Sequence, residues 1–236
     1  MAITAWPCLA HAQSRPVQEL LQTELVYAQD AGELQVTAGA TGFGAAHAVD
    51  LPLAVEYGIT DAWQIGAEWR GFARGGAAPH GGLAELAVAT KYSFMNLGGR
   101  PLHAAIGLEL EAPRGAGAED EPTRIAPMAA VAMDVHRWRN THLFAAASAG
   151  YAVRRADAAS RDVAPAISGG AIVPFRRWSL ATEVSYERQA ELAELFVTPS
   201  IIVDAGHSWQ VVVGTPIRAA GDGDRLALSV LFTYER

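Results

Sequence analysis

The sequence predicts an all-β fold, a transmembrane antiparallel up-and-down β-barrel of about twelve strands. Apolar residues recur at every second position in about twelve runs of the chain. The connections between runs alternate between short and long, and aromatic residues collect beside the short ones. A soluble β-sandwich or lipocalin-like barrel, with its apolar face inward, is the alternative, but it explains neither the long strands nor the aromatic residues at the turns.

The stretch YGITDAWQIGAEWRG, residues 57–71, shows the alternation most clearly. After a tight turn, apolar residues take every second position: Trp63, Ile65, Ala67 and Trp69. Side chains two residues apart on a strand share one face. We therefore expect these four residues to face lipid, and Glu68 and Arg70 to face the lumen.

Aromatic residues lie within a few positions of the tight turns. Their rings suit the membrane–water interface because one part is apolar and another is hydrated. The aromatic girdle predicted in this way consists of Tyr57, Trp63, Tyr92, Phe94, Trp138, Phe175, Trp178 and Trp209. Short turns of such barrels face the periplasm, so we expect this girdle and both chain termini on the periplasmic side.

Polar residues that alternate with the lipid-facing ones are the candidate pore residues. They are Glu56, Glu68, Arg70, Glu85, Lys91, His103, Glu109, Glu111, Arg124, Asp134, Glu183 and Arg218. Acids outnumber bases, so an open lumen should prefer cations or neutral solutes. The same charges can instead pair across the interior and fill it. The sequence supports a narrow pore and a filled lumen about equally.

The chain divides into three parts. Residues 1–12 are apolar and end in an A-x-A pattern, as a signal peptide does, although the basic n-region is missing. A start further upstream and an ordinary buried N-terminus are the alternatives. Residues 13–32 are expected to form a periplasmic segment that can enter the lumen as a plug, and residues 33–236 the barrel. Residues 15–29 fit a short amphipathic helix, and residues 23–28 also fit a strand.

Several functions are excluded or disfavoured. The net charge is −7, Lys91 is the single lysine and the sequence has no basic run, which argues against nucleic-acid binding. The sequence contains no Gly-x-Ser-x-Gly elbow and no HExxH or His-x-His spacing. We therefore expect no enzyme activity, no metal and no cofactor. The expected partners are outer-membrane lipid, the barrel-assembly machinery and an unidentified small solute.

The stretch LPLAVEYGITDAWQIGAEW resembles a strand–turn–strand signature of an outer-membrane family linked to the phenol meta-degradation pathway and described as transporter-like. The residues that carry it are Pro52, Tyr57, Gly58, Ile59, Thr60, Asp61, Trp63 and Gly66. Elsewhere the resemblance extends only to the hairpin rhythm. It implies a bacterial outer-membrane barrel that passes small, often aromatic or apolar, compounds. The chain departs from common outer-membrane usage by ending in Tyr234-Glu235-Arg236 rather than in an aromatic residue.

These patterns predict a Gram-negative outer-membrane channel for passive or facilitated passage of small solutes. Two alternatives remain. One is a barrel without conductance that serves a structural or partner-binding role, and the other is a barrel enzyme acting on lipid.

Overall fold

The computed structural model describes residues 20–43, 48–72, 82–113, 123–153, 163–189, 192–206, 208–221 and 224–236. Within these ranges, none of the helical structure is long and apolar enough to cross a membrane. The strands are β1 (Leu34–Phe43), β2 (Ala48–Thr60), β3 (Trp63–Phe72), β4 (Gly82–Phe94), β5 (Leu102–Pro113), β6 (Thr123–Val135), β7 (Thr141–Val153), β8 (Val163–Phe175), β9 (Trp178–Gln189), β10 (Leu192–Asp204), β11 (Trp209–Gly214), β12 (Ile217–Ala220) and β13 (Ala227–Glu235). A 3-10 turn, η1 (Leu97–Gly99), lies between β4 and β5.

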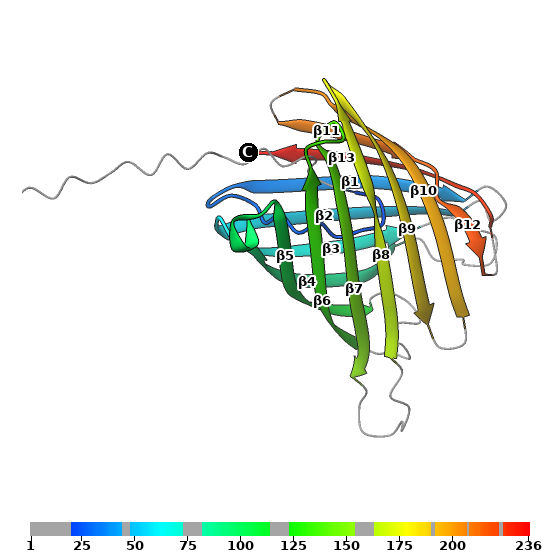
Figure 1. The fold of residues 1–236 in the computed structure, drawn as a ribbon. Coiled ribbons are helices and arrows are strands. Elements are labelled where there is room, and N and C mark those ends of the chain that lie inside the picture. The colour runs from blue at the N-terminus through cyan, green and yellow to red at the C-terminus, as the bar shows by residue number, and fades with distance from the viewer. Residues whose placement is uncertain are drawn as a thin grey trace, which may run out of the picture.

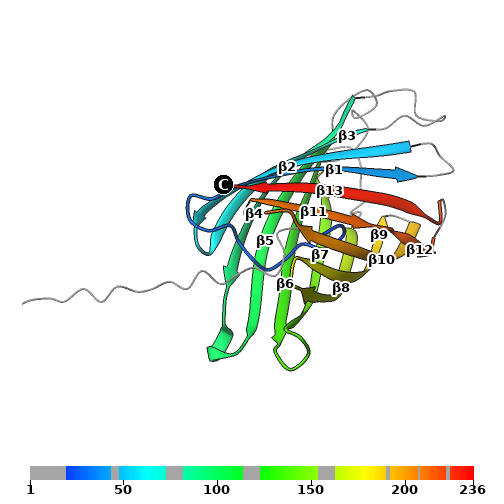
Figure 2. The same cartoon turned by 90° about the horizontal axis from the view of Figure 1, so that it is seen from above.

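The strands form one closed antiparallel barrel (Figures 1 and 2). Sequence neighbours pair in order from β1 to β10, and β13 closes the ring by pairing with both β1 and β11. β11 and β12 both pair with β10, so they are the two halves of one barrel strand. The interruption falls at Thr215 and Pro216, where proline lacks the N–H that a ladder needs. The predicted fold, a barrel of twelve strands, is confirmed.

The two faces of the wall differ as the alternation predicts. Outward side chains are apolar and exposed, as at Ile65, Val88 and Leu108, whereas inward positions such as Gln64 and Lys91 are buried. An apolar band around a closed barrel is stable in lipid, and in bacteria such barrels reside in the outer membrane. A soluble barrel would carry the opposite arrangement, so that alternative is wrong.

The aromatic residues proposed as a girdle stand at the end of the barrel that carries the tight turns. Seven of the eight are between 40% and 68% exposed: Tyr57, Trp63, Tyr92, Phe94, Trp138, Trp178 and Trp209. The eighth, Phe175, is partly covered because its ring stacks on Trp178 with the centroids 4.1 Å apart. Their depth in a bilayer remains a prediction.

Residues 20–32 run as irregular chain inside the ring of strands (Figure 2). In the described part of the stretch, residues 20–29, neither the expected helix nor the expected strand is formed, so both interpretations are wrong there. The physical reason is that many polar groups of this segment bond to the barrel wall, as described below. The predicted signal peptide and residues 13–19 lie outside the described residues.

Candidate functional site

The lumen is lined differently on its two sides. Polar residues face inward around the whole barrel, and on β7 to β13 large apolar residues lie among them, beside polar ones such as His142 and Glu183. The large apolar residues are Phe144, Ile172, Ile202, Val212 and Leu231, all buried. They form one apolar cluster with Leu20, Leu25 and Val26 of the inserted segment. The segment therefore covers the apolar side of the lumen, which the sequence interpretation did not anticipate.

The end of the segment at Leu21 and Gln22, called its inner end, is held by Glu183 on β9. This carboxylate has no exposed surface, and it accepts the backbone N–H of Leu21 at 3.2 Å and that of Gln22 at 2.9 Å. Beside it, Gly214 on β11 leaves room for Leu21: a Cβ there would stand 2.4 Å from the Leu21 Cδ1 atom. Charge-assisted bonds to backbone N–H groups are stronger than neutral ones. Glu183 is thus the main polar anchor of this end.

The middle of the segment is bonded to β4. Lys91 forms an ion pair with Glu24 and donates to the Leu25 carbonyl at 3.0 Å. Two residues further along β4, the Ser93 hydroxyl donates to the Val26 carbonyl at 2.5 Å. The single lysine of the chain therefore binds the inserted segment. The segment spans the lumen from β9 to β4.

Tyr27 lies between two histidines of the wall. Its hydroxyl is 3.0 Å from the His142 Nε2 atom, and its ring centroid is 5.9 Å from that of His103. Both histidines also contact Asp134, at 2.6 Å from His142 and 3.3 Å from His103. Burial, with the Asp134 charge in addition, raises the pKa of the Tyr27 phenol, so the hydroxyl stays protonated. Across the described ranges no group of three His, Cys, Asp or Glu residues is arranged to hold a metal ion.

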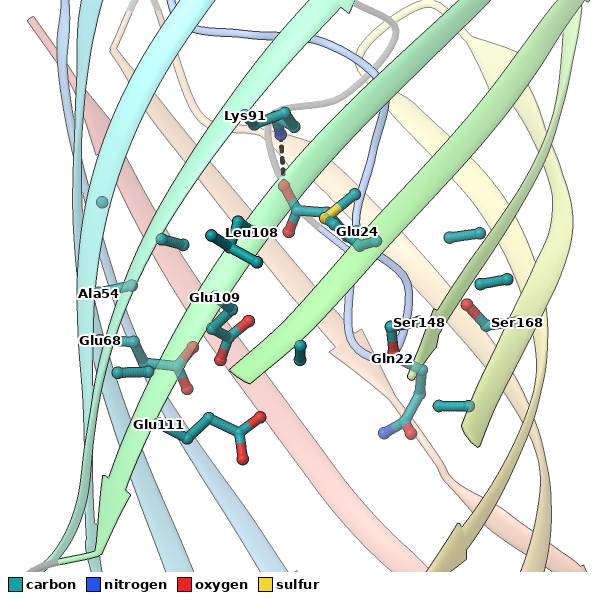
Figure 3. A pocket seen from close by; sticks show the side chains of 18 of the residues that line it. Gln22, Glu24, Ala54, Glu68, Lys91, Leu108, Glu109, Glu111, Ser148 and Ser168 are labelled. Atoms are coloured by element: carbon teal, nitrogen blue, oxygen red, sulfur yellow. Dashed lines mark hydrogen bonds and ion pairs between the residues drawn. The ribbon is translucent and has the colours of Figure 1, made fainter. Parts of the chain in front are cut away.

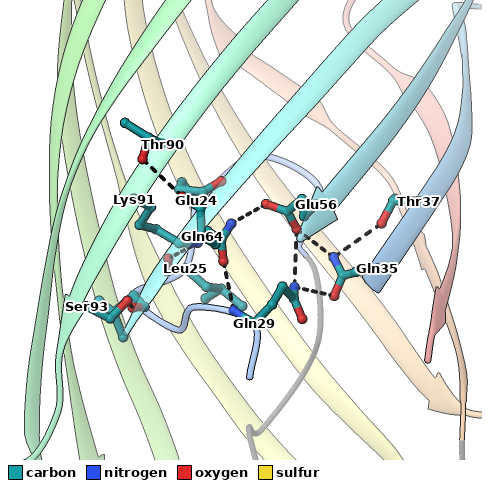
Figure 4. Close-up of polar contacts among 11 residues, drawn as sticks. Glu24, Leu25, Gln29, Gln35, Thr37, Glu56, Gln64, Thr90, Lys91 and Ser93 are labelled. Atoms are coloured by element: carbon teal, nitrogen blue, oxygen red, sulfur yellow. Dashed lines mark hydrogen bonds and ion pairs between the residues drawn. The ribbon is translucent and has the colours of Figure 1, made fainter. Parts of the chain in front are cut away.

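A cluster of amides and one carboxylate holds the part of the segment nearest β1 (Figure 4). The Gln29 backbone N–H donates to the Gln64 side chain at 3.0 Å, and the Gln29 amide donates to Gln35 at 2.8 Å. Glu56 accepts from Gln35 at 2.9 Å and from Gln64 at 2.5 Å. Such a network satisfies polar groups that would be costly to bury alone.

The turn motif that carries the family resemblance also contacts the segment. Asp61 accepts the Ala31 backbone N–H at 3.0 Å, and Thr60 caps the turn by accepting the Trp63 N–H at 3.1 Å. A Cβ on Gly58 would stand 2.0 Å from the Asp30 carbonyl oxygen, so only glycine fits there. Part of the motif therefore has a structural role in seating residues 30–33.

A cavity of about 290 Å³ lies between the inserted segment and the end of the barrel that carries the long connections. Figure 3 shows this cavity from close by. Gln22 and Glu24 of the segment line it together with the barrel wall. Glu68, Glu109 and Glu111 lie on one side of the cavity, and Ser148 and Ser168 on the other. The remaining inward positions are mostly small: Ala54, Gly66, Ala87, Ala89, Ala126, Ala146 and Ala166. The cavity thus combines an acidic wall on β3 and β5 with a wall of mostly small residues, which also contains Glu187 on β9.

The twelve predicted pore residues all stand at inward positions of the strands, but they divide between different surroundings. Five line the cavity: Glu56, Glu68, Lys91, Glu109 and Glu111. Four others have partners elsewhere in the wall or in the segment. Glu183 bonds to the inserted segment, His103 and Asp134 contact each other beside Tyr27, and Arg218 pairs with Glu194 at 3.2 Å. The other three are Arg70, Glu85 and Arg124; Arg70 pairs with Glu68 at 2.9 Å and Glu85 at 3.7 Å, while Arg124 lies opposite Glu111 in the strand register. The expected charge pairing is therefore local, and Glu109 has no ion-pair partner among the described residues.

No family model matches the chain, and no curated protein matches it. Among solved structures, it is similar to the COG4313 outer membrane channel from Pseudomonas putida F1, with a TM-score of 0.71 at 11% identity over 92% of this chain and 100% of that one. It is also similar to the NanC porin (TM-score 0.65, 11% identity, 85% of this chain and 98% of that one). The KdgM porin gives a TM-score of 0.62 at 9% identity with the same coverage, 85% and 98%. At such identities the likeness shows a shared porin-like barrel fold, and the link to phenol degradation stays a resemblance.

Proposed function

We propose that this protein is an outer-membrane channel that lets small solutes pass by diffusion. The observation that carries the proposal is the cavity inside the closed barrel, lined mostly by small residues and by several carboxylates, with Glu68, Glu109 and Glu111 together on one side. The similar solved structures are named as porins or as an outer membrane channel, which supports the same role. Pockets that take small ligands are concave and are lined mainly by apolar groups with a few placed polar ones.

The charges of the cavity favour cations and neutral solutes. Glu68, Glu109 and Glu111 face it, with Lys91 as a cation that is already paired with Glu24. Field lines focus in a cleft with low-dielectric walls, so these carboxylates raise the local concentration of cations. Anions would be repelled from the same wall.

Passage requires the inserted segment to move or to leave a narrow path beside it. Residues 20–29 cross the lumen and cover the apolar residues of β7 to β13. When the segment shifts, that apolar surface joins the pathway. A lining that is acidic on one side and apolar on the other suits small solutes with an aromatic or apolar part, which is the class implied by the family resemblance.

The reversal potential in a potassium chloride gradient tests the proposed selectivity. The full chain, refolded in detergent and inserted in a planar bilayer, should show a potential that indicates preference for potassium. Glu109→Gln should lower that preference, whereas Asp61→Asn, which removes one charge at the β2–β3 turn and keeps an oxygen for the Ala31 N–H, should not. Chloride preference, or an equal effect of both variants, would contradict the proposed role of the cavity.

One observation favours the second candidate, a barrel without conductance. The inserted segment is bonded to β4, to β9 and, through Tyr27, to His142 on β7, so it closes the lumen on several sides. In that case the folded protein would carry no current under any applied voltage. The same bilayer recording therefore separates the two functions.

A further inference from the structure

The tight turns at one end of the barrel are unequally charged. Three successive turns, between β4 and β5, β6 and β7, and β8 and β9, carry arginines and no acidic residue. We call the exposed residues Arg100, Arg137, Arg139, Arg176 and Arg177 the arginine sector. Of the other two turns at this end, the one between β2 and β3 carries Asp61 instead, and the one between β10 and β11 directly follows Asp204. The positive charge of the turns is therefore gathered over β4 to β9, while Arg236 lies at the same end of the barrel, just beyond β13.

The sector is continuous in space. Strands β4 to β9 follow one another around the wall, so the three turns stand side by side (Figure 1). With adjacent strands about 4.8 Å apart, the sector extends over roughly 25 Å of the rim. Arg139 links two of the turns, because its guanidinium lies 5.4 Å from the ring centroid of Phe175 at the end of β8.

The guanidinium groups of the sector are available for a ligand. Arg137, Arg176 and Arg177 form no ion pair with any carboxylate in the described ranges. Asp134 below the β6–β7 turn is bonded inward to His103 and His142. Asp204 borders the sector, since its N–H donates to the Arg177 carbonyl, but its carboxylate accepts the Gly206 N–H at 3.3 Å.

The aromatic residues beside the sector favour a position at the membrane surface. Trp138 lies between Arg137 and Arg139 in the same turn and is 68% exposed, the largest exposure among the large apolar side chains described. Trp178 follows Arg177 directly and stacks on Phe175. Trp favours the level of the lipid head groups, and a guanidinium matches a phosphate with two parallel hydrogen bonds.

We propose that the arginine sector binds the phosphate groups of anionic phospholipids in the inner leaflet of the outer membrane. Short turns face the periplasm, so this end of the barrel meets that leaflet. Clusters of arginine beside a membrane attract anionic lipid, and each charge contributes to the attraction. The binding gathers such lipid along β4 to β9, leaves the rest of the rim uncovered and is independent of whether the barrel conducts.

Quenching of Trp138 and Trp178 by brominated lipid tests this proposal. The full chain, with Trp6, Trp63, Trp69 and Trp209 changed to Phe, is reconstituted in phosphatidylcholine vesicles. Part of the lipid is brominated phosphatidylglycerol in one series and brominated phosphatidylcholine in the other. We expect phosphatidylglycerol to associate at least about threefold more strongly than phosphatidylcholine at low salt. The ratio of the two association constants should fall toward one in roughly 0.5 M sodium chloride, because salt screens surface charge.

Two double variants show whether the sector causes the preference. Arg137→Gln with Arg176→Gln should at least halve the ratio of association constants. Arg188→Gln with Arg225→Gln, which removes the same charge beside the long connections at the other end of the barrel, should leave it unchanged. A heat-modifiable shift on a gel confirms that each variant is folded. Equal quenching by the two lipids in the otherwise unaltered chain, or an equal effect of both double variants, would overturn the proposal.

Discussion

Glu183, fully buried in the wall of the barrel on β9, accepts the backbone N–H of Gln22 at 2.9 Å. The two residues are separated by 161 positions in the chain. This contact joins the inserted segment to the side of the lumen opposite Lys91. Among the described polar contacts, Glu183 is the one that holds Leu21 and Gln22 at this end of the segment.

Glu183→Ala should release the inner end of the segment. The change removes both acceptors of the Leu21 and Gln22 N–H groups and leaves these donors to find water, at a cost of about 1.5–3 kcal/mol for bonds to a charged group. We expect faster protease cleavage near residue 22 in the folded barrel. Glu183→Gln keeps one oxygen acceptor, so its cleavage rate should lie between that of the unchanged protein and that of the alanine variant. Unchanged cleavage in the alanine variant would show that the apolar contacts alone hold the segment.

Gly58→Ala should displace the segment at its other end. A Cβ at this position would stand 2.0 Å from the Asp30 carbonyl oxygen and 2.7 Å from that of Gln29, and backbone atoms cannot move aside as a flexible side chain does. We expect faster hydrogen exchange at residues 29–33 with the barrel still folded. Gly66→Ala on β3 is the matched control, because its nearest neighbour would be 3.4 Å away. The same exchange in both variants would contradict the described packing.

Two adjacent residues of β4 test which face meets lipid. Val88 points outward near the middle of the strand and is 51% exposed, whereas Ala89 lines the cavity. Val88→Arg should lower the free energy of unfolding in lipid by about 2–4 kcal/mol, as arginine does on the lipid face near the bilayer midplane. Ala89→Arg should fold normally and reduce any current. Urea titrations in vesicles measure the free energy of unfolding of both variants. Equal destabilisation would mean that the assignment of faces is wrong.

The strand alternation was sufficient to predict the barrel and the inward positions, because a period of two leaves only two choices of face and lipid accepts one of them. The apolar residues inside β10 and β11 were missed, although the sequence contains a signal for them. The runs Ile201–Val203 and Val211–Val213 are apolar on both faces, which indicates that something covers the inner one. The path of residues 20–32 was not predictable, because its bonds go to side chains of distant strands and produce no local period.

Single-channel recording of the refolded full chain, beside a version lacking residues 13–32, tests the central claim most directly. A gel shift on heating first confirms that both barrels are folded. The account predicts a small, potassium-preferring current in the full chain and a severalfold larger one after the deletion, because the segment crosses the lumen beneath the acidic cavity. Two folded barrels that both remain silent would contradict the proposed channel.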